Sequence, residues 1–170
     1  MSAGGIPDYF ALDRYGISPA DVVRLTLGCE PERIRPLVVL APVWSPQVLE
    51  GHVERIEVVS DGLVKVDDVA CDGFSFSYVR SGIGAPQAGD VALALGCTGC
   101  SHLLFIGSVG GLSERERVGD LALPTHSVGG DGFSAYLAPS SSGPQQPAER
   151  EAEADAGFQA VVDGCARDAC

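Results

Sequence analysis

Two glycine-rich turns, each placed after an apolar segment, are the part of this sequence best suited to chemistry. They are residues 82–84 (Gly-Ile-Gly) and residues 107–111 (Gly-Ser-Val-Gly-Gly). Such a turn leaves backbone N–H groups open, with no Cβ atom beside them, so it can bind anionic or hydroxyl oxygens. A glycine turn after a strand is also a common structural feature, and each turn taken alone leaves both interpretations open.

Three polar residues near these turns could act on a ligand. Arg80 precedes the first turn and could supply a cation for an anionic ligand, or it could be a solvent-facing strand residue paired with Asp or Glu. His126 could act as a base or ligand, or it could be a polar loop residue. Asp131, in the loop beyond His126, is, like His126, a candidate for the acid that a reaction at these turns would need.

The cysteines offer a weaker candidate. Cys97 and Cys100 have CxxC spacing with His102 nearby, and together with Cys165 and Cys170 they could be imagined as a zinc site. The second pair has four intervening residues, and the first falls at a predicted junction between a helix and a strand. We therefore expect turn and packing roles for Cys97 and Cys100, and no metal site.

The elements that position the turns follow from periodicity. Ser18 is a predicted N-cap for a helix that ends at Gly28, and a second helix begins at Pro86 and ends at Gly96. Strands are predicted over residues 37–41, 53–60, 63–70, 74–78, 103–106 and 120–123, and a helix over the tail 148–170. The alternation of aromatic residues and serine in 74–78 indicates a half-buried strand. Because a strand, a helix and a strand follow one another over residues 75–107, part of the sheet should be parallel.

Size and charge narrow the class of protein. With 170 residues, 45% of them apolar, the chain is long enough for one domain with its own core. A formal net charge of −12 argues against nucleic acid and against an anionic membrane as partners. There is no secretion signal pattern, and the longest apolar run, residues 37–43, is too short to span a bilayer. We expect a cytoplasmic protein whose cysteines are thiols.

The order of the turns is typical of one enzyme family. In that family Gly-x-Gly-x-Pro, a helix, Gly-Ser/Thr-x-Gly-Gly/Ala, Val-Gly-Asp and Pro-Thr follow one another. This chain has the same motifs at residues 82–86, 107–111, 118–120 and 124–125, and residues 130–137 are similar to the loop that follows in the family. The chain therefore resembles the nucleoside phosphorylase/nucleosidase superfamily, which includes purine and uridine phosphorylases and methylthioadenosine nucleosidases.

The resemblance, over roughly residues 37–137, implies a three-layer α/β fold with a mixed, partly parallel central sheet. The implied organisation is an N-terminal extension with a short helix (1–36), an α/β core (37–139), and a loop with a C-terminal helix (140–170). It also implies a homo-oligomer, a dimer or a hexamer. That oligomer would bind a nucleoside-like small molecule without a cofactor, and phosphate would be the co-substrate if the reaction is phosphorolysis.

Carried over by position, the resemblance gives roles to six residues of the turns. Phosphate, or the attacking water of a hydrolase, would meet Gly84, Gly107 and Ser108. Ribose and base would lie against Ile83, Val109 and Gly110. We expect a side chain at Gly107 or Gly110 to be excluded, either by the space the ligand needs or by a positive φ.

Several features depart from the family pattern. The loop that carries Gly and Arg for phosphate in phosphorylases is Ala-Pro-Val-Trp-Ser-Pro-Gln here, residues 41–47. Its Trp44 could cover the ligand cleft or could be core. Phe105 stands where the family has a second arginine. Without guanidinium contacts a phosphate binds weakly, which favours hydrolysis over phosphorolysis, or no catalysis.

The catalytic pairs of the family are also missing. Met1 is the only methionine and residues 60–61 are the only Ser-Asp, so the Met-Glu and Ser-Asp motifs have no counterpart in this sequence. We expect a C-terminally truncated fold in which the catalytic residues are unknown. Two functions stay open: cleavage of an N-glycosidic bond when a missing segment or partner completes the site, and a non-catalytic binding or scaffold subunit.

Overall fold

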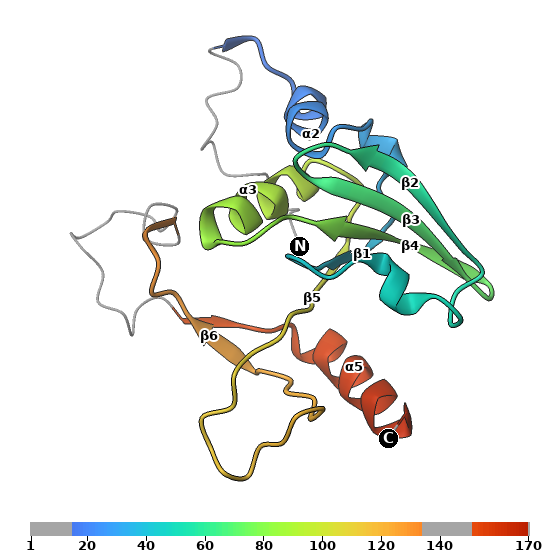
Figure 1. Ribbon diagram of the computed structural model, residues 1–170. Coiled ribbons are helices and arrows are strands. Elements are labelled where there is room, and N and C mark those ends of the chain that lie inside the picture. The colour runs from blue at the N-terminus through green and yellow to red at the C-terminus, as the bar shows by residue number, and fades with distance from the viewer. Residues whose placement is uncertain (1–14, 134–150, 170) are drawn as a thin grey trace. The chain divides into compact units, whose positions relative to one another are not determined.

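A computed structural model describes residues 15–133 and 151–169, and the chain divides into two compact units, Met1–Gly107 (unit 1) and Ser108–Cys170 (unit 2). Unit 1 contains a five-stranded sheet with helices α2 and α3, and unit 2 contains a two-stranded sheet with helix α5 (Figure 1). Over the described ranges, no helix is long and apolar enough to cross a membrane. The domain boundaries predicted at residues 36 and 139 stay predictions.

Helix α2 (Pro19–Leu27) begins and ends where the sequence predicts. The Asp21 N–H donates to Ser18 Oγ at 3.2 Å, and the Ser18 N–H donates to the Asp21 carboxylate at 2.9 Å, which completes a capping box. Gly28 ends the helix in the left-handed conformation, with φ 71°. Helix α3 (Ala85–Leu95) is likewise confirmed, with Gly84 and Gly96 at its two caps.

The sheet of unit 1 has the strand order β2-β3-β4-β1-β5. Its strands are β1 (Leu37–Leu40), β2 (Arg55–Asp61), β3 (Lys65–Cys71), β4 (Phe74–Arg80) and β5 (His102–Phe105). Strands β2, β3 and β4 are antiparallel neighbours, whereas β1 pairs in parallel with β4 on one side and with β5 on the other. The mixed, partly parallel sheet is thus confirmed, and β1 lies between the two strands that α3 connects.

Apolar side chains cover both faces of this sheet. Helices α2 and α3 pack on one face through residues such as Leu27 and Leu95, which meet Val38 and Val79 of the strands (Figure 1). The other face carries a smaller cluster around Tyr78. Short 3-10 helices lie at Pro31–Arg33 (η2) and Pro46–Leu49 (η3), and Leu49 packs against the second cluster.

Strand β4 corrects one expectation. The alternation of aromatic residues and serine predicts a half-buried strand, but all four residues from Phe76 to Val79 are buried. The reason is that β4 lies between β3 and β1 in a sheet covered on both faces. Ser77 can be buried because its Oγ accepts the N–H of Arg35 at 2.9 Å.

Unit 2 corrects two further expectations. Residues 120–123 are predicted as a strand, but they form none; the paired strands of this unit are β6 (His126–Val128) and β7 (Glu151–Glu153). A strand needs a hydrogen-bonded neighbour, which an apolar pattern alone does not provide. The tail helix is confirmed only from Ala156: α5 spans Ala156–Ala169, and Asp155 accepts the Phe158 N–H at 2.7 Å.

Candidate functional site

The loops that follow β1, β4 and β5 start side by side at one edge of the sheet. These three strands are parallel, and Leu40 pairs with both Val79 and Phe105. Beyond the strands, the Gly82 N–H donates to Pro42 O at 2.9 Å and the Ile106 N–H donates to Leu40 O at 3.0 Å. In α/β sheets the crevice beyond the carboxyl ends of parallel strands is the usual place for a ligand. We refer to residues 41–45, 80–84 and 106–107 as the carboxyl edge.

The first glycine turn has the conformation that only glycine adopts easily. Gly82 has φ 80° and Gly84 has φ 118°. A Cβ atom on Gly82 would also lie 3.0 Å from the side-chain oxygen of Gln87. Between the two glycines, Ile83 is 80% exposed, so its side chain is available to a ligand at this edge.

The second glycine turn differs from the expectation. Neither Gly107 nor Gly110 has a positive φ, so the argument from backbone conformation is wrong for both residues. A Cβ atom on Gly107 would make an ordinary contact of 3.6 Å with Phe105 Cε1, and one on Gly110 would have no neighbour within 4 Å. Only the space that a ligand would need can still require glycine there.

Arg80, the last residue of β4, is the cation of the carboxyl edge, and it forms an ion pair. Its Nη2 lies 3.3 Å from Oδ2 of Asp67 on β3, whose side chain is only 2% exposed. The pairing with an acid is therefore observed, but the side chain does not face solvent as the second interpretation expects: it is only 24% exposed, and its Nε is buried. Sequence reasoning missed Asp67; the available signal was an Asp-Asp pair, residues 67–68, in a strand whose other residues, apart from Lys65, are apolar.

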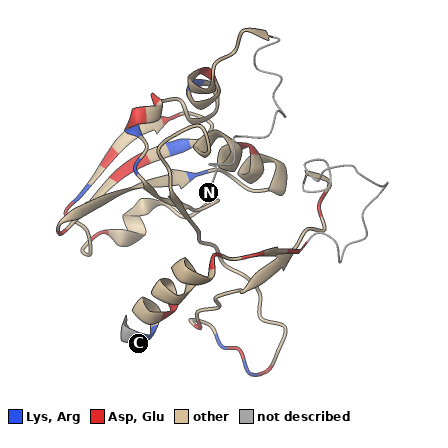
Figure 2. Cartoon of the chain, turned by 180° about the vertical axis from the view of Figure 1, so that it is seen from behind, with Lys and Arg blue, Asp and Glu red and all other residues tan. Residues whose placement is uncertain are grey.

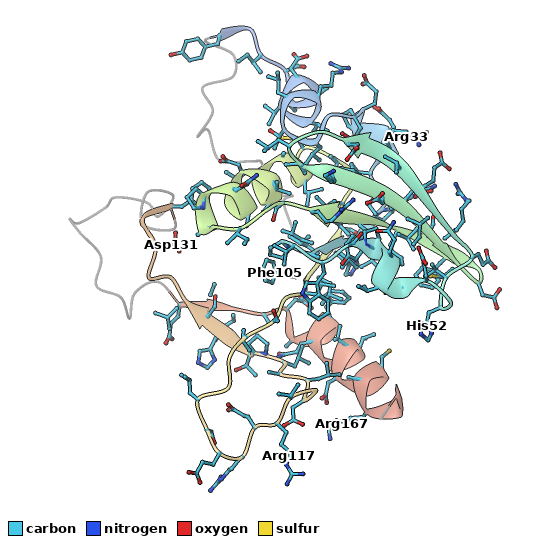
Figure 3. The ribbon with its side chains drawn as sticks, viewed as in Figure 1. Arg33, His52, Phe105, Arg117, Asp131 and Arg167 are labelled. Carbon is cyan, nitrogen blue, oxygen red and sulfur yellow. The ribbon has the colours of Figure 1, made fainter. Side chains whose placement is uncertain are left out.

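The loop after β1 is held to the sheet by a tyrosine. Tyr78 Oη donates to the backbone oxygen of Trp44 at 3.1 Å. Burial raises the pKa of the Tyr78 hydroxyl, which keeps it protonated as a donor. The Trp44 residue itself is 44% exposed, so it is not core. Phe105, 58% exposed at the end of β5, adds a second aromatic ring and no charge to this edge (Figure 3).

The remaining predicted site residues lie in unit 2. Ser108 and Val109 are exposed, and the structure as described gives the Ser108 hydroxyl no hydrogen bond. His126 begins β6 and is exposed, with Nδ1 2.9 Å from Thr125 Oγ1, while Asp131 is partly buried. That Ser108, Val109, Gly110, His126 and Asp131 share one site with the turn at residues 82–84 stays a prediction.

Unit 2 also holds a carboxylate contact that sequence reasoning missed. The Glu116 carboxylate accepts the N–H groups of Leu112 at 2.9 Å and Ser113 at 3.2 Å. A Cβ atom on Gly111 would lie only 2.7 Å from the same carboxylate oxygen. The Ser-x-x-Glu spacing of residues 113–116 was a signal for this contact. Backbone N–H groups just after the second glycine turn thus bind an anionic oxygen.

Comparison with known proteins decides the family. The phosphorylase superfamily matches residues 71–169 of the chain, a stretch that includes both glycine turns. This chain belongs to the phosphorylase superfamily. A comparison with curated proteins found no match.

Solved structures of the superfamily show the same fold. The uridine phosphorylase of Vibrio fischeri is 19% identical, with a TM-score of 0.63 over 80% of this chain and 54% of that chain. The 5′-methylthioadenosine/S-adenosylhomocysteine nucleosidase of Neisseria meningitidis is 21% identical, with a TM-score of 0.59 over 79% of this chain and 59% of that chain. The chain therefore spans a little more than half the length of each of these superfamily members.

The cysteines of the CxxC motif have a packing role in this superfamily member. Cys97 and Cys100 pack against the core, and burial raises the pKa of both thiols. The described part of the chain holds no group of three or more His, Cys, Asp or Glu side chains that could bind a metal.

A polar recess of about 270 Å³ lies on the helix-covered face of the sheet. Figure 2 shows acidic and basic residues on neighbouring strands of this sheet. Its lining side chains are Glu32, Arg33, Arg35, Arg55, Glu57 and Asp68. They neutralise one another: Arg35 bonds both Asp68 oxygens, at 2.6 and 2.9 Å. The recess is not part of the carboxyl edge: Arg35, one of its lining residues, precedes the start of β1, whereas the carboxyl edge follows the end of that strand.

Proposed function

We propose that the chain binds a nucleoside-type ligand at the carboxyl edge, and that the reaction of this site is cleavage of the N-glycosidic bond. One observation carries the proposal: a turn with two positive-φ glycines, Gly82 and Gly84, follows a parallel strand in a member of the phosphorylase superfamily. Backbone N–H groups in such a turn can donate to the oxygens of a sugar without a side chain in the way.

The other residues of the proposal follow from their order in the family pattern. Ser108 follows Gly107 directly and supplies a hydroxyl for phosphate or for the attacking water. Ile83 lies against the ribose, and Val109 and Gly110 form the floor under the base. The exposure of Ile83, Ser108 and Val109 leaves each of them available to a ligand.

Cleavage needs two groups besides this cradle. The oxygen of the nucleophile forms a bond to the anomeric carbon while the bond to the base nitrogen breaks, and the base must receive a proton. The 170 residues contain no Met-Glu and no Ser-Asp beyond residues 60–61, so no proton donor of the family type is available within them. The same observation favours a second candidate function, a binding or scaffold subunit that does not itself catalyse.

The experiment is a calorimetric titration of the purified chain with adenosine, uridine and ribose 1-phosphate. We expect at least one of them to bind. Gly84→Ala should abolish binding because φ 118° is unfavourable for alanine, whereas Gly99→Ala, with ordinary φ and no neighbour within 4 Å, should leave the affinity unchanged. Ser108→Ala should weaken binding roughly fivefold, the effect of one hydrogen bond.

The possible results of this titration test the assignment of the site separately from membership of the family. If no ligand binds at millimolar concentration, or if Ser108→Ala leaves a measured affinity unchanged, the assignment of the site is wrong and family membership alone stands. Binding without turnover supports the scaffold function, while turnover by the chain supports the enzyme.

A further inference from the structure

The charge of the carboxyl edge rests on one arginine. Arg80 is the only Lys or Arg in residues 41–45, 80–84 and 106–107. Lys65 lies opposite it on β3, but its ammonium group is bound to the Asp61 carboxylate. An anionic ligand at this edge would therefore depend on Arg80.

The charge of Arg80 is already neutralised by a buried carboxylate of the neighbouring strand β3. Asp67 is 2% exposed, and its Oδ2 lies 3.3 Å from Arg80 Nη2. A carboxylate this deeply buried needs a positive partner, because an isolated buried charge is very costly. The Asp67 carboxylate thus holds the guanidinium and cancels its charge.

Among the described residues 15–107 of unit 1, no other Lys or Arg is free to replace it. Within the described residues of this unit, every Lys and Arg side chain forms an ion pair with a carboxylate: Arg24, Arg33, Arg35, Arg55, Lys65 and Arg80. Phosphate sites in proteins depend on guanidinium or ammonium groups with charge to spare. A phosphate dianion placed at this edge would also lie near the buried Asp67 carboxylate, which repels it.

One donor of Arg80 is nevertheless unused. Its Nε–H is buried and has no hydrogen-bond partner among the described residues. An unsatisfied buried donor is unfavourable unless an acceptor reaches it. A neutral oxygen, from water or a sugar hydroxyl, can accept this hydrogen bond without adding charge beside Asp67.

We propose that Asp67 is the residue that selects the nucleophile of this site, excluding phosphate and admitting water. This inference rests on the proposed function, and it assigns the reaction to hydrolysis. The oxygen of water bonds to the anomeric carbon, the bond to the base nitrogen breaks, and one proton of the water passes to the base. The products are the free sugar and the free base.

The experiment titrates inorganic phosphate into the folded chain by calorimetry. We expect no binding to the parent protein at millimolar concentration. Asp67→Asn keeps the shape of the side chain but removes its charge, so phosphate should bind this variant measurably, with a Kd at least roughly tenfold below the limit found for the parent, the effect of one charge-assisted contact. Adding Arg80→Gln to Asp67→Asn should remove that gain. Glu30→Gln is the matched control: it removes one negative charge from the ion pairs of Arg24 on α2, which keeps its second partner Asp21, so it should give no gain.

Two results would overturn the inference: phosphate binding to the parent protein that Arg80→Gln abolishes, or no gain in Asp67→Asn while the variant keeps its circular dichroism spectrum. If Asp67→Asn fails to fold, the parent and Arg80→Gln titrations decide, since neither should bind phosphate. Parallel titrations with adenosine and uridine keep the two proposals apart. Nucleoside binding without the phosphate gain overturns the role of Asp67 alone, whereas loss of all nucleoside binding overturns the proposed function.

Discussion

Backbone conformation makes Gly82 a sensitive position in unit 1. With φ 80° and the Gln87 side-chain oxygen 3.0 Å from the place of an added Cβ atom, Gly82→Ala should lower the free energy of unfolding by about 1–3 kcal/mol. Gly99→Ala should change it by no more than about 0.5 kcal/mol, because Gly99 has ordinary φ and open space around it. Urea denaturation of the two variants measures the difference, and equal midpoints would contradict the turn geometry described above.

Asp68 gives unit 1 a defined pH dependence. The Arg35 guanidinium bonded to Asp68 holds the pKa of that carboxyl below its ordinary value of 3.8. Because this pKa is lower in the folded than in the unfolded chain, the stabilisation is present above pH 3.8 and is lost as the pH falls through 3.8 and below.

Asp68→Asn tests this dependence. The substitution should lower the free energy of unfolding at neutral pH by about 2 kcal/mol, and the loss of stability on acidification should be smaller in the variant than in the parent. Glu30→Gln breaks the exposed pair with Arg24 and should have a much smaller effect at neutral pH. Identical acid denaturation of the parent and Asp68→Asn would show that the pair does not stabilise the fold.

At the scale of the element, packing of α2 against the sheet can be tested within one helix. Leu27 is fully buried and Leu25 is 80% exposed, two residues apart in the same helix. Leu27→Ala should lower the free energy of unfolding by about 2–5 kcal/mol, because it removes buried methyl groups and leaves a cavity. Leu25→Ala should change it by no more than about 0.5 kcal/mol. A similar loss in both variants, measured by urea denaturation, would mean that α2 does not pack as described.

Whole-molecule behaviour gives a prediction about assembly. Leu112 and Val118 of unit 2 are fully exposed and Leu121 is 75% exposed, and exposed apolar residues favour association. Together with the assembly expected from the family, this predicts a dimer or larger oligomer of the 17.6 kDa chain. Light scattering at micromolar concentration measures the mass, and a monodisperse monomer would contradict the prediction.

A second prediction at this scale concerns turnover. The purified 170-residue chain should cleave adenosine and uridine slowly or not at all, with or without phosphate, because no group of the family type protonates the leaving base. Release of free base, followed by chromatography, is the measurement. Robust turnover would contradict the prediction and would make His126 and Asp131 the first residues to replace.

The sequence by itself determined the features that depend on near neighbours in the chain. The capping box of Ser18 and Asp21 and the left-handed stop at Gly28 are set by interactions within a few residues. The glycine turn at residues 82–84 could also be predicted, because its motif lies within a few consecutive residues. These features could therefore be predicted, and the structure has each of them.

Only the tertiary structure decided what depends on distant partners. It placed β1 between β4 and β5, and it gave the buried Ser77 hydroxyl a hydrogen bond from the Arg35 N–H. Residues 120–123 form no strand. It also paired Arg80 with Asp67, 13 positions earlier in the chain. Periodicity within one segment does not specify which strand lies beside it. Burial and ion pairing are properties of the neighbours that the fold brings together, and for that reason the charge of the carboxyl edge could not be predicted from the sequence.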